Sequence, residues 1–456
     1  PASGTHDGAG PSGDGNDTVV AAGAPWFMTL FGRDSLLTAW MALPVDPSLA
    51  LSTLRALADR QGATIDPLNE EEPGRILHEV RHGYFPLSPG SPVYYGTVDA
   101  TPLFVMLVGE LHRWGVPPEQ LAPLMPYVDR ALAWIDTYGD RDGDGFVEYQ
   151  RRTDRGLLNQ GWKDSNDPIR FRDGRTGEAP IALAEVQGYV YAAFLARGEL
   201  ARTFDDESVA AAWEARAADL RSRFHEAFWL PELGWFAMAL DGEKRPVDSL
   251  TSNIGHCLWT GLIEPEYADS VVEHLMSPEM FTGWGIRTMS SAMAAFDPAS
   301  YQNGSVWPHD TALCAAGLAR YGFGAEARQV ASGLFDAAVA FAGRLPELFC
   351  GFDRDEFPYP VGYPTACSPQ AWAAATPVLL LRTLLGLDPD VPNRKIHVRP
   401  HLPERLGAVE VSNLPLAGRR VRLAAGRGGA ELTDLPPGIA VVAEPRPLAP
   451  GRGRST

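Results

Sequence analysis

The chain has 456 residues, of which 45% are hydrophobic and 21% charged, a balance typical of a globular protein with a large buried core. Its formal net charge of -18 argues against nucleic acid and anionic membranes as partners, whereas a neutral sugar would not be repelled. We find no secretory signal and no apolar run of membrane-spanning length. The four cysteines fit no disulfide framework or zinc spacing, so we expect reduced thiols in a cytoplasmic protein.

The chain opens with a segment rich in Gly, Ser and Asp, residues 1–20, which we expect to be disordered. Helical periodicity then dominates up to residue 390, with apolar residues recurring at i, i+3, i+4 and i+7. The pattern predicts helices at 31–43, 47–61, 101–114, 121–138, 182–203, 208–228, 252–263, 265–276, 309–321, 325–342 and 370–387, and a short one near 286–296.

The connections between these helices alternate between short and long. In an up-and-down helical array, alternate connections lie at the same end, so the long ones should gather on one face. About twelve antiparallel helices arranged in this way predict a mainly α fold, an (α/α)6 toroid over residues 21–390, with its binding site in the long loops. The long connections are 62–100, 139–181, 229–251, 277–308 and 343–369.

The last part of the chain has a different pattern. After Asp388, short alternating runs such as KIHVRPHLP and RRVRLAAG are separated by Gly and Pro. Residues 391–456 are therefore predicted to form a small β-rich appendage that ends in a tail.

The first chemical cluster is PWFMTLFGRDS, where Arg33 and Asp34 open an apolar helix. Asp34 is either a helix N-cap or, with Arg33, part of a pair that fixes donors and acceptors for sugar hydroxyls. Trp26 lies just upstream and offers a stacking face.

The second cluster is LNQGWKDSND, residues 158–167. Glycoside hydrolysis needs one protonated carboxylic acid and one carboxylate. An aromatic wall such as Trp162 disfavours a charge, and this would help Asp164 keep its proton near neutral pH. Lys163 would oppose that effect if it pointed inward, so we expect it to point away. Asp167 is expected to end the loop, and the alternative for Asp164 itself is an ordinary solvated loop residue.

The third cluster is GRLPELF, in which Glu347 lies among apolar residues at the start of the last long loop. A single acid in such company is either capped by backbone N–H groups or functional. Its place on the same face as Asp164 favours function.

The fourth cluster, TGWGIRTMSS and YQNGSVWPHD, concentrates Trp284, Tyr301, Trp307, His309 and Asp310 in one loop. Aromatic planes with polar edges suit pyranose rings. Asp310 is expected to cap the following helix.

Two further patterns are not expected to be functional. GAGPSG, residues 8–13, has no strand before it and no helix after it, so it is not a dinucleotide motif. HEVRH, residues 78–82, matches a zinc-protease motif but lies between Pro and Gly residues that prevent the necessary helix.

An acidic turn, DRDGDGFVEYQRR, begins like a calcium loop at Asp140, Asp142 and Asp144. Its twelfth position is Arg151 rather than the bidentate Glu of such loops. We expect a plain acidic turn, with structural calcium as the alternative, and no cofactor requirement.

Many motifs occur together and in order: FGRDS, PGRILHEVR, YYGTVDATPLF, QGWKDSND, EVQGY, TGWGIRT, NGSVWPHD, LPELF and SPQAW. This set resembles the amylo-α-1,6-glucosidase (glycogen debranching enzyme C-terminal) family over about residues 21–387. The resemblance implies an (α/α)6 fold related to glucoamylases and an α-glucan substrate. Relatives usually carry an N-terminal β domain, so we expect this chain to be a part of a longer protein.

The resemblance also implies roles for individual residues. Arg33 and Asp34 would grip the terminal glucose, Asp164 would be the general acid and Glu347 the general base. Hydrolysis would then invert the anomeric carbon, with the two carboxyl groups roughly 6.5–9.5 Å apart to admit water. Residues expected to line the sugar site or support it are Trp26, Glu79, Asp99, Trp162, Glu185, Gln187, Trp284, Trp307, His309 and Trp372.

Rival interpretations stay open. The same toroid hosts enzymes for trehalose, sucrose, glucosylglycerate and mannosylglycerate, because a fold does not fix a substrate. The chain could also be a non-catalytic carbohydrate-binding protein, although the presence of both Asp164 and Glu347 argues against that. A zinc protease would require bound zinc.

Overall fold

The computed structural model describes residues 18–80 and 92–449. Most of the segment expected to be disordered (residues 1–17), the motif GAGPSG, the last two residues of HEVRH and the tail from residue 450 lie outside the described residues. Within the described residues, no helix combines the length and the apolar character that a membrane span requires.

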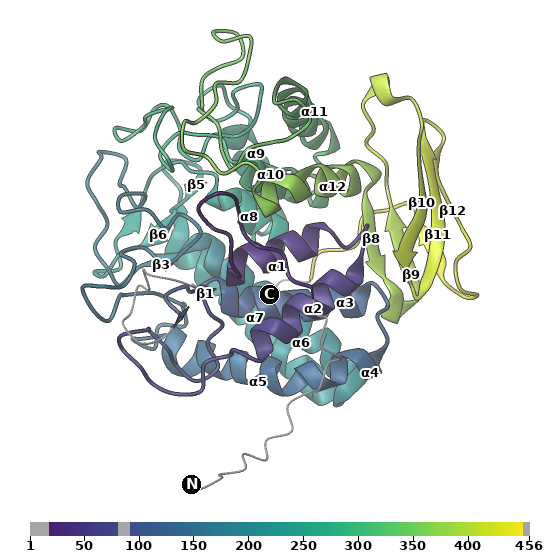
Figure 1. Cartoon of the computed structure of the whole chain (residues 1–456), viewed down its shortest axis with the longest axis horizontal. Coiled ribbons are helices and arrows are strands. Elements are labelled where there is room, and N and C mark those ends of the chain that lie inside the picture. Colours follow the sequence, from purple (N-terminus) through teal and green to yellow (C-terminus); the bar gives the residue numbers. More distant parts are fainter. Residues whose placement is uncertain (1–17, 81–91, 450–456) are drawn as a thin grey trace, which may run out of the picture.

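Six helices form a closed inner ring, in which each helix packs against the next and the last packs against the first. This confirms the predicted mainly α, (α/α)6 architecture. Figure 1 views these helices from the side. The ring helices, in order, are α1 Gly32–Met41, α3 Ala100–Arg113, α6 Ala184–Phe204, α8 Asn253–Thr260, α10 Pro308–Arg320 and α12 Ala371–Leu385.

An outer layer of helices alternates with the ring along the chain. The sequence starts these helices with clear signals: Asp46 accepts from Ser48 N at 2.9 Å, and Asp206 accepts from Ser208 N at 2.8 Å. The helix predicted at 121–138 is interrupted, with a 3-10 turn before α5 and a π turn after it. The outer elements are α2 Pro47–Ala58, α4 Pro118–Leu121, η1 Ala122–Leu124, α5 Met125–Trp134, η2 Ile135–Gly139, α7 Glu207–Phe228, α9 Pro265–Leu275 and α11 Gly324–Ala340.

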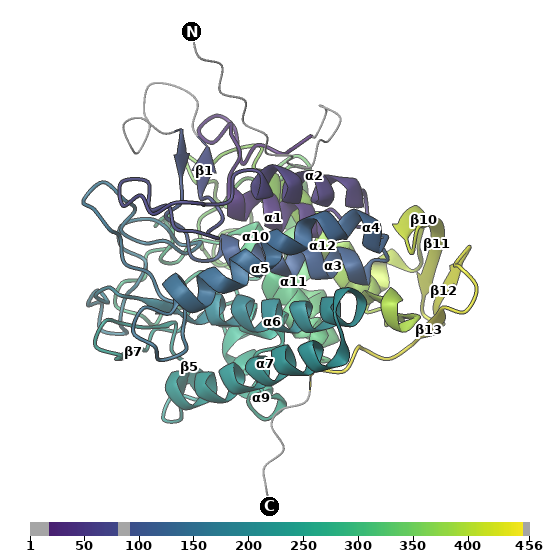
Figure 2. The ribbon, with the colours of Figure 1, turned by 90° about the horizontal axis from the view of Figure 1, so that it is seen from below.

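The long connections lie together at one end of the ring, and the β-rich C-terminal part lies at the other (Figures 1 and 2). Ring helices begin at the loop end, so their N-termini and free N–H groups converge there. Short strands stiffen these loops: β1 Glu79–Val80, β2 Val93–Tyr94, β3 Ala182–Leu183, β4 Trp229–Leu230, β5 Trp235–Phe236, β6 Ala239–Leu240 and β7 Pro246–Val247.

The short helix predicted near 286–296 is wrong. Ile286, Arg287 and Met289 instead make isolated bridges to Phe281, Val306 and Thr251. The backbone of this extended segment is hydrogen-bonded to neighbouring loops, as in Thr288 N to Ser305 O at 2.9 Å. Tertiary pairing therefore overrides a local pattern that was compatible with a helix.

The C-terminal part contains two three-stranded sheets. β8 Leu387–Asp390, β9 Lys395–Val398 and β13 Ala440–Val442 form one, and β10 Val409–Leu416, β11 Arg419–Gly426 and β12 Gly429–Thr433 form the other. The first strand starts directly after α12, ahead of the predicted boundary. Gly386 makes this turn with a φ of +60°, and a Cβ there would lie only 2.2 Å from the carbonyl oxygen of Arg399, so the turn requires glycine.

Candidate active site

Arg33 connects several segments at the end of the ring that carries the long loops. It lies in the first turn of α1, is 2% exposed, and donates from Nε to Asp99 at 2.6 Å. Its other nitrogens donate to Thr97 Oγ1 at 3.1 Å, to Gly161 O at 2.8 Å and to Asp164 at 3.3 Å. One guanidinium thus links three segments that are far apart in the sequence and fixes where the Asp164 carboxyl lies.

The loop that carries Asp164 is held from both sides. Gln302 accepts from Ser165 N at 3.0 Å and donates to Trp162 O at 3.2 Å. Asn159 donates to Ser165 O at 2.7 Å. These bonds leave the Asp164 side chain 31% exposed, with Arg33 as its charged neighbour. The arrangement is preorganised for contact with a bound molecule.

Two opposing effects act on Asp164. Burial raises the pKa of its carboxyl above the usual value, and the positive charge of Arg33 opposes that rise. Lys163 is buried, and its ammonium donates to Thr288 O at 2.7 Å. Burial lowers the pKa of Lys163 to about 8, while Asp310 and Glu185 raise it.

Glu347 is 3% exposed and has two fixed donors. Tyr301 OH donates to Oε1 at 2.7 Å, and Cys367 N donates to Oε2 at 2.9 Å. Burial raises the pKa of Glu347, both donors oppose the rise, and the charge of Asp164 adds to it. The two carboxyls are therefore electrostatically coupled, so a proton on Asp164 favours the ionised form of Glu347.

We expect Tyr301→Phe to move the acidic limb of the kcat/KM profile to higher pH, because Glu347 loses a donor to its charged form. Activity at the optimum should fall about tenfold. The control is Tyr363→Phe, since the Tyr363 ring packs 5.7 Å from Tyr301 without a bond to Glu347. An acidic limb that stays in place in Tyr301→Phe would contradict a positioning role for this hydroxyl.

Asp34 does not cap α1, whose N-cap is Phe31. Its carboxyl is 5% exposed and accepts from Gln370 Nε2 at 3.0 Å. Burial raises the pKa of Asp34 to about 7; Arg33 opposes this, and the charges of Asp164 and Glu347 reinforce it. Asp34 therefore lies within the same electrostatic cluster as the two candidate catalytic carboxyls.

Asp34→Asn should stabilise the protein relative to wild type increasingly as pH rises. The Asp34 carboxyl ionises near pH 4 in an unfolded chain, whereas its pKa in the folded protein is about 7. The protonated carboxyl therefore contributes its full stability below pH 4, and this contribution is lost as pH rises through about 7. The free energy of unfolding should shift in favour of Asp34→Asn by up to about 4 kcal/mol between pH 4 and 8. Urea denaturation at several pH values measures this, and a difference independent of pH would contradict it.

An aromatic cluster lies beside these groups. The His309 ring stacks on Trp372 with centroids 3.8 Å apart, and Trp162 contacts both His309 at 5.1 Å and Trp307 at 5.7 Å. Trp307 is held by a bond from Nε1 to Tyr301 O at 2.9 Å. Burial lowers the pKa of His309 well below its usual value, which favours the neutral imidazole. The structure thus brings four of the predicted aromatic or imidazole residues together.

Asp99, Glu185 and Gln187 lie deeper. Asp99 holds Arg33, as described, and Gln187 donates to Val147 O at 2.8 Å and to Leu183 O at 3.0 Å, which ties a long loop to α6. Glu185 is 1% exposed, and burial raises its pKa. All three side chains are buried, and Gln187 has both of its amide hydrogens engaged.

Two further predicted tryptophans have different surroundings. Trp26 is 62% exposed and donates to Thr365 O at 3.1 Å, at the rim of the loop that follows Glu347. Trp284 is buried under the guanidinium of Arg354, 4.2 Å from its ring centroid. Among the contacts of the described residues, none joins Trp284 to Asp164 or Glu347.

The expectation that Asp310 caps a helix is wrong. α10 begins at Pro308 with Trp307 at its N-cap position. Asp310 is fully buried and accepts from His256 Nε2 at 2.8 Å, while Tyr189 OH bonds the other ring nitrogen of His256 at 2.6 Å. The His256 ring stacks on Trp162 at 5.9 Å, so this buried chain supports the aromatic cluster from behind.

The acidic turn at Asp140, Asp142 and Asp144 does bring three carboxylates within 4.8 Å of one another. The ammonium of Lys244 lies 2.7 Å from Asp142 and 2.6 Å from Asp144, and also 3.0 Å from Glu148. A lysine therefore already neutralises much of the charge that would attract a cation.

We expect calcium or a chelator to leave the Tm of the wild-type protein unchanged, because Lys244 balances the acidic turn. In Lys244→Met the same carboxylates lose this partner, so calcium should raise the Tm of the variant. Scanning fluorimetry of both proteins tests this, and a fall in the wild-type Tm with chelator would reinstate the calcium alternative.

Several residues of the site carry no signal in the sequence. Thr97, Gln302 and His256 are ordinary polar residues in their local context, and their roles arise only from contacts across the fold. Tyr301 belongs to the predicted aromatic loop, but its bond to Glu347 joins positions 46 residues apart.

Glycoside hydrolases use a pair of carboxyl groups, and in this helical ring Asp164 and Glu347 lie on separate loops at the end where the ring helices begin. The family model of the mannosylglycerate hydrolase MGH1-like glycoside hydrolase domain matches residues 34–349, well over half of the chain. The chain therefore belongs to this family of glycoside hydrolases. No match was found among the curated proteins that were compared.

Solved structures show the same fold. A mannosylglycerate hydrolase from Thermus thermophilus, in complex with Tris and D-glycerate, is 18% identical with a TM-score of 0.58, and the match covers 80% of this chain and 96% of that one. A protein described as a glycosidase is 17% identical with a TM-score of 0.55, covering 80% and 91%. The motifs therefore predicted correctly that the chain is a glycoside hydrolase. The family that matches is the MGH1-like family and not the debranching enzyme family.

Proposed function

We propose that this protein hydrolyses a small glycoside, a hexose joined to a short hydroxy acid such as glycerate, with inversion at the anomeric carbon. The single observation that carries the proposal is the pair of carboxyl groups of Asp164 and Glu347, which lie on two loops and have different hydrogen-bond partners. The chain that carries them belongs to the MGH1-like family. The hydroxy acid is suggested by the family and by the related hydrolase, whose structure contains D-glycerate.

The different surroundings suggest different roles. Glu347 receives two short hydrogen bonds, which favour a carboxylate able to take a proton from water. Asp164 has one longer contact with Arg33 and is partly exposed, so its proton can pass to a glycosidic oxygen. In the proposed step, Asp164 protonates the leaving oxygen while Glu347 deprotonates the attacking water.

An α-1,6-glucan is the second candidate substrate. It is favoured by the ordered motifs and by the exposed Trp26, which offers a stacking face for a further sugar at the rim. A debranching reaction would use the same acid and base.

A panel of glycosides tests the proposal: glucosylglycerate, mannosylglycerate, trehalose, isomaltose and a glycogen limit dextrin. We expect release of hexose from a glycerate glycoside by the wild type and none above background by Asp164→Asn. Trp26→Ala should leave this activity intact. Preferred hydrolysis of isomaltose or limit dextrin, weakened by Trp26→Ala, would instead establish the second candidate, and no hydrolysis of any glycoside would overturn both.

A further inference from the structure

A cavity of about 640 Å³ lies at the opposite end of the ring from Asp164 and Glu347. It is bounded by the C-terminal ends of the ring helices, by the start of β8 and by the segment 445–449. Its volume falls within the range of small-ligand sites. Every ring helix contributes to its wall, through Trp40, Met106, Tyr191, Trp259, Arg320 and Arg382.

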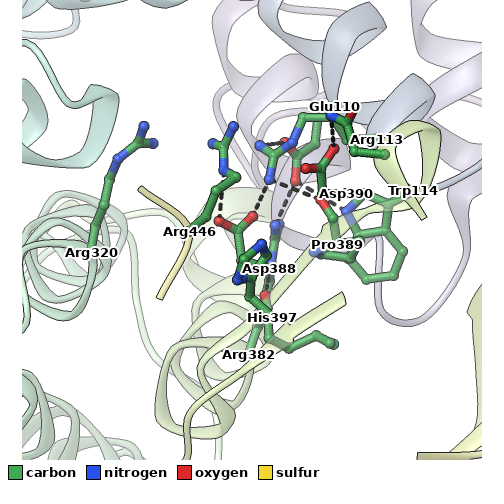
Figure 3. Close-up of polar contacts among 12 residues, drawn as sticks. Glu110, Arg113, Trp114, Arg320, Arg382, Asp388, Pro389, Asp390, His397 and Arg446 are labelled. Carbon is green, nitrogen blue, oxygen red and sulfur yellow. Dashed lines mark hydrogen bonds and ion pairs between the residues drawn. The ribbon is translucent and has the colours of Figure 1, made fainter. Parts of the chain in front are cut away.

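Ion pairs join several of the residues that line this cavity, and Figure 3 shows these contacts. Arg113 pairs with Glu110 at 3.0 Å and also with Asp388. Arg382 donates to Glu110 at 2.5 Å. Arg446, on the C-terminal segment, pairs with Asp388 at 3.1 Å and with Glu199 at 3.3 Å. Glu110, Asp388 and Glu199 are all engaged in this network.

Arg320 stands apart from the network, as Figure 3 shows. It donates from Nη1 to Trp259 O at 3.1 Å and forms no ion pair within the described part of the chain. The pKa of Arg320 is lowered to about 10 by burial and by the positive charge of Arg446, and the negative charge of Asp388 opposes this lowering. The guanidinium thus lacks a counter-charge of its own.

The whole wall has an excess of positive charge, although the protein has a net charge of -18. Six arginines and four carboxylates line it, and the two arginines that form no ion pair among the described residues are Arg320 and the exposed Arg399. The full set is Arg113, Arg202, Arg320, Arg382, Arg399, Arg446, Glu110, Glu199, Glu214 and Asp388.

Helix capping explains part of this pattern. Arg320 is the last residue of α10, where a cation interacts favourably with the helix dipole, and its bond to Trp259 O caps the neighbouring α8. That role uses one of five guanidinium hydrogens. Helix capping does not explain why Arg320 also lines a large cavity.

The rest of the wall is apolar. Trp40 and Trp259 are in edge contact with centroids 4.7 Å apart, and Met106 and Leu195 also line the cavity. The Arg382 guanidinium lies 4.9 Å from the Trp40 ring and so is already partnered by an aromatic face. A ligand of this cavity therefore needs an apolar body as well as a negative charge.

We propose that this cavity binds a small organic anion whose single carboxylate or phosphate group pairs with Arg320 and whose apolar body lies against Trp40 and Trp259. The site lies beyond the proposed hydrolytic function and does not depend on it.

Titration calorimetry on the full chain tests the proposal with hexanoate, hexyl phosphate, hexanol and inorganic phosphate. We expect hexanoate or hexyl phosphate to bind at least tenfold more tightly than hexanol or inorganic phosphate, and the tighter of the two identifies the anionic group. Arg320→Met should weaken that binding at least tenfold, and Arg320→Lys should weaken it less. Glycoside hydrolysis by Arg320→Met should equal that of the wild type.

The matched control is Arg420→Met, because Arg420 also donates to a single backbone carbonyl, Asn413 O at 3.1 Å, but lies outside the cavity. A second variant, Ala319→Phe, fills the cavity without altering a charge and should abolish binding even if Arg320→Met folds poorly. The proposal is overturned if neither hexyl anion binds, if inorganic phosphate binds as tightly as they do, or if Ala319→Phe leaves binding unchanged.

Discussion

Asp164→Asn and Glu347→Gln should each lower kcat/KM for the preferred glycoside by about 10³- to 10⁴-fold, because each removes one half of a coupled proton transfer. Both variants should keep the fold, since each substitution is nearly isosteric. Initial rates of hexose release, with circular dichroism as the check on folding, measure the effect.

The leaving group separates the two roles. A dinitrophenyl glycoside needs little protonation on departure, so Asp164→Asn should recover much of its activity on it while Glu347→Gln should not. The matched controls are Asp167→Asn and Glu356→Gln, which are exposed acids on the same two loops. Equal losses in both variants on both substrates would contradict the assignment of acid and base.

Arg33→Met should destabilise the protein by about 3–5 kcal/mol, because it leaves the buried Asp99 carboxylate without its charged partner. It should also lower kcat/KM by about 10²-fold or more, since Asp164 loses the group that fixes its position. Chemical denaturation and steady-state kinetics measure the two effects separately.

Arg245→Met provides the control for this variant. Arg245 also pairs with a buried aspartate, Asp241, at 2.7 Å, but its own side chain is 44% exposed. Asp241 keeps two backbone donors, from Glu243 N at 3.0 Å and Arg245 N at 2.9 Å. The loss of stability should therefore stay below about 1 kcal/mol. A similar loss in both variants would show that Arg33 is no more than an ordinary ion-pair residue.

The ring helices and the end of the ring that carries the long loops were predictable, because both depend on local periodicity and on connection length. The helix expected near 286–296 failed where long-range pairing decided the structure: Arg287 and Thr288 satisfy their backbone groups on other loops. An apolar pattern alone cannot separate these outcomes when the segment is buried.

For the site, short motifs indicated Arg33, Asp34, Asp164 and Glu347, and the structure places them in one electrostatic cluster. The motifs could not show what each carboxyl contacts. Asp310 illustrates the limit, since its position in a first helical turn suggested a cap, while a partner 54 residues away engages its side chain. Partners that are distant in sequence leave no local signal.

The proposed mechanism is tested most directly by the anomer that wild-type enzyme releases first from an α-linked glycerate glycoside. Proton NMR within the first minutes of reaction, before mutarotation, distinguishes the two anomers of the free hexose. Single displacement by a water that Glu347 activates predicts that the β-anomer appears first. Initial release of the α-anomer would mean that Asp164 and Glu347 do not act as an inverting acid and base.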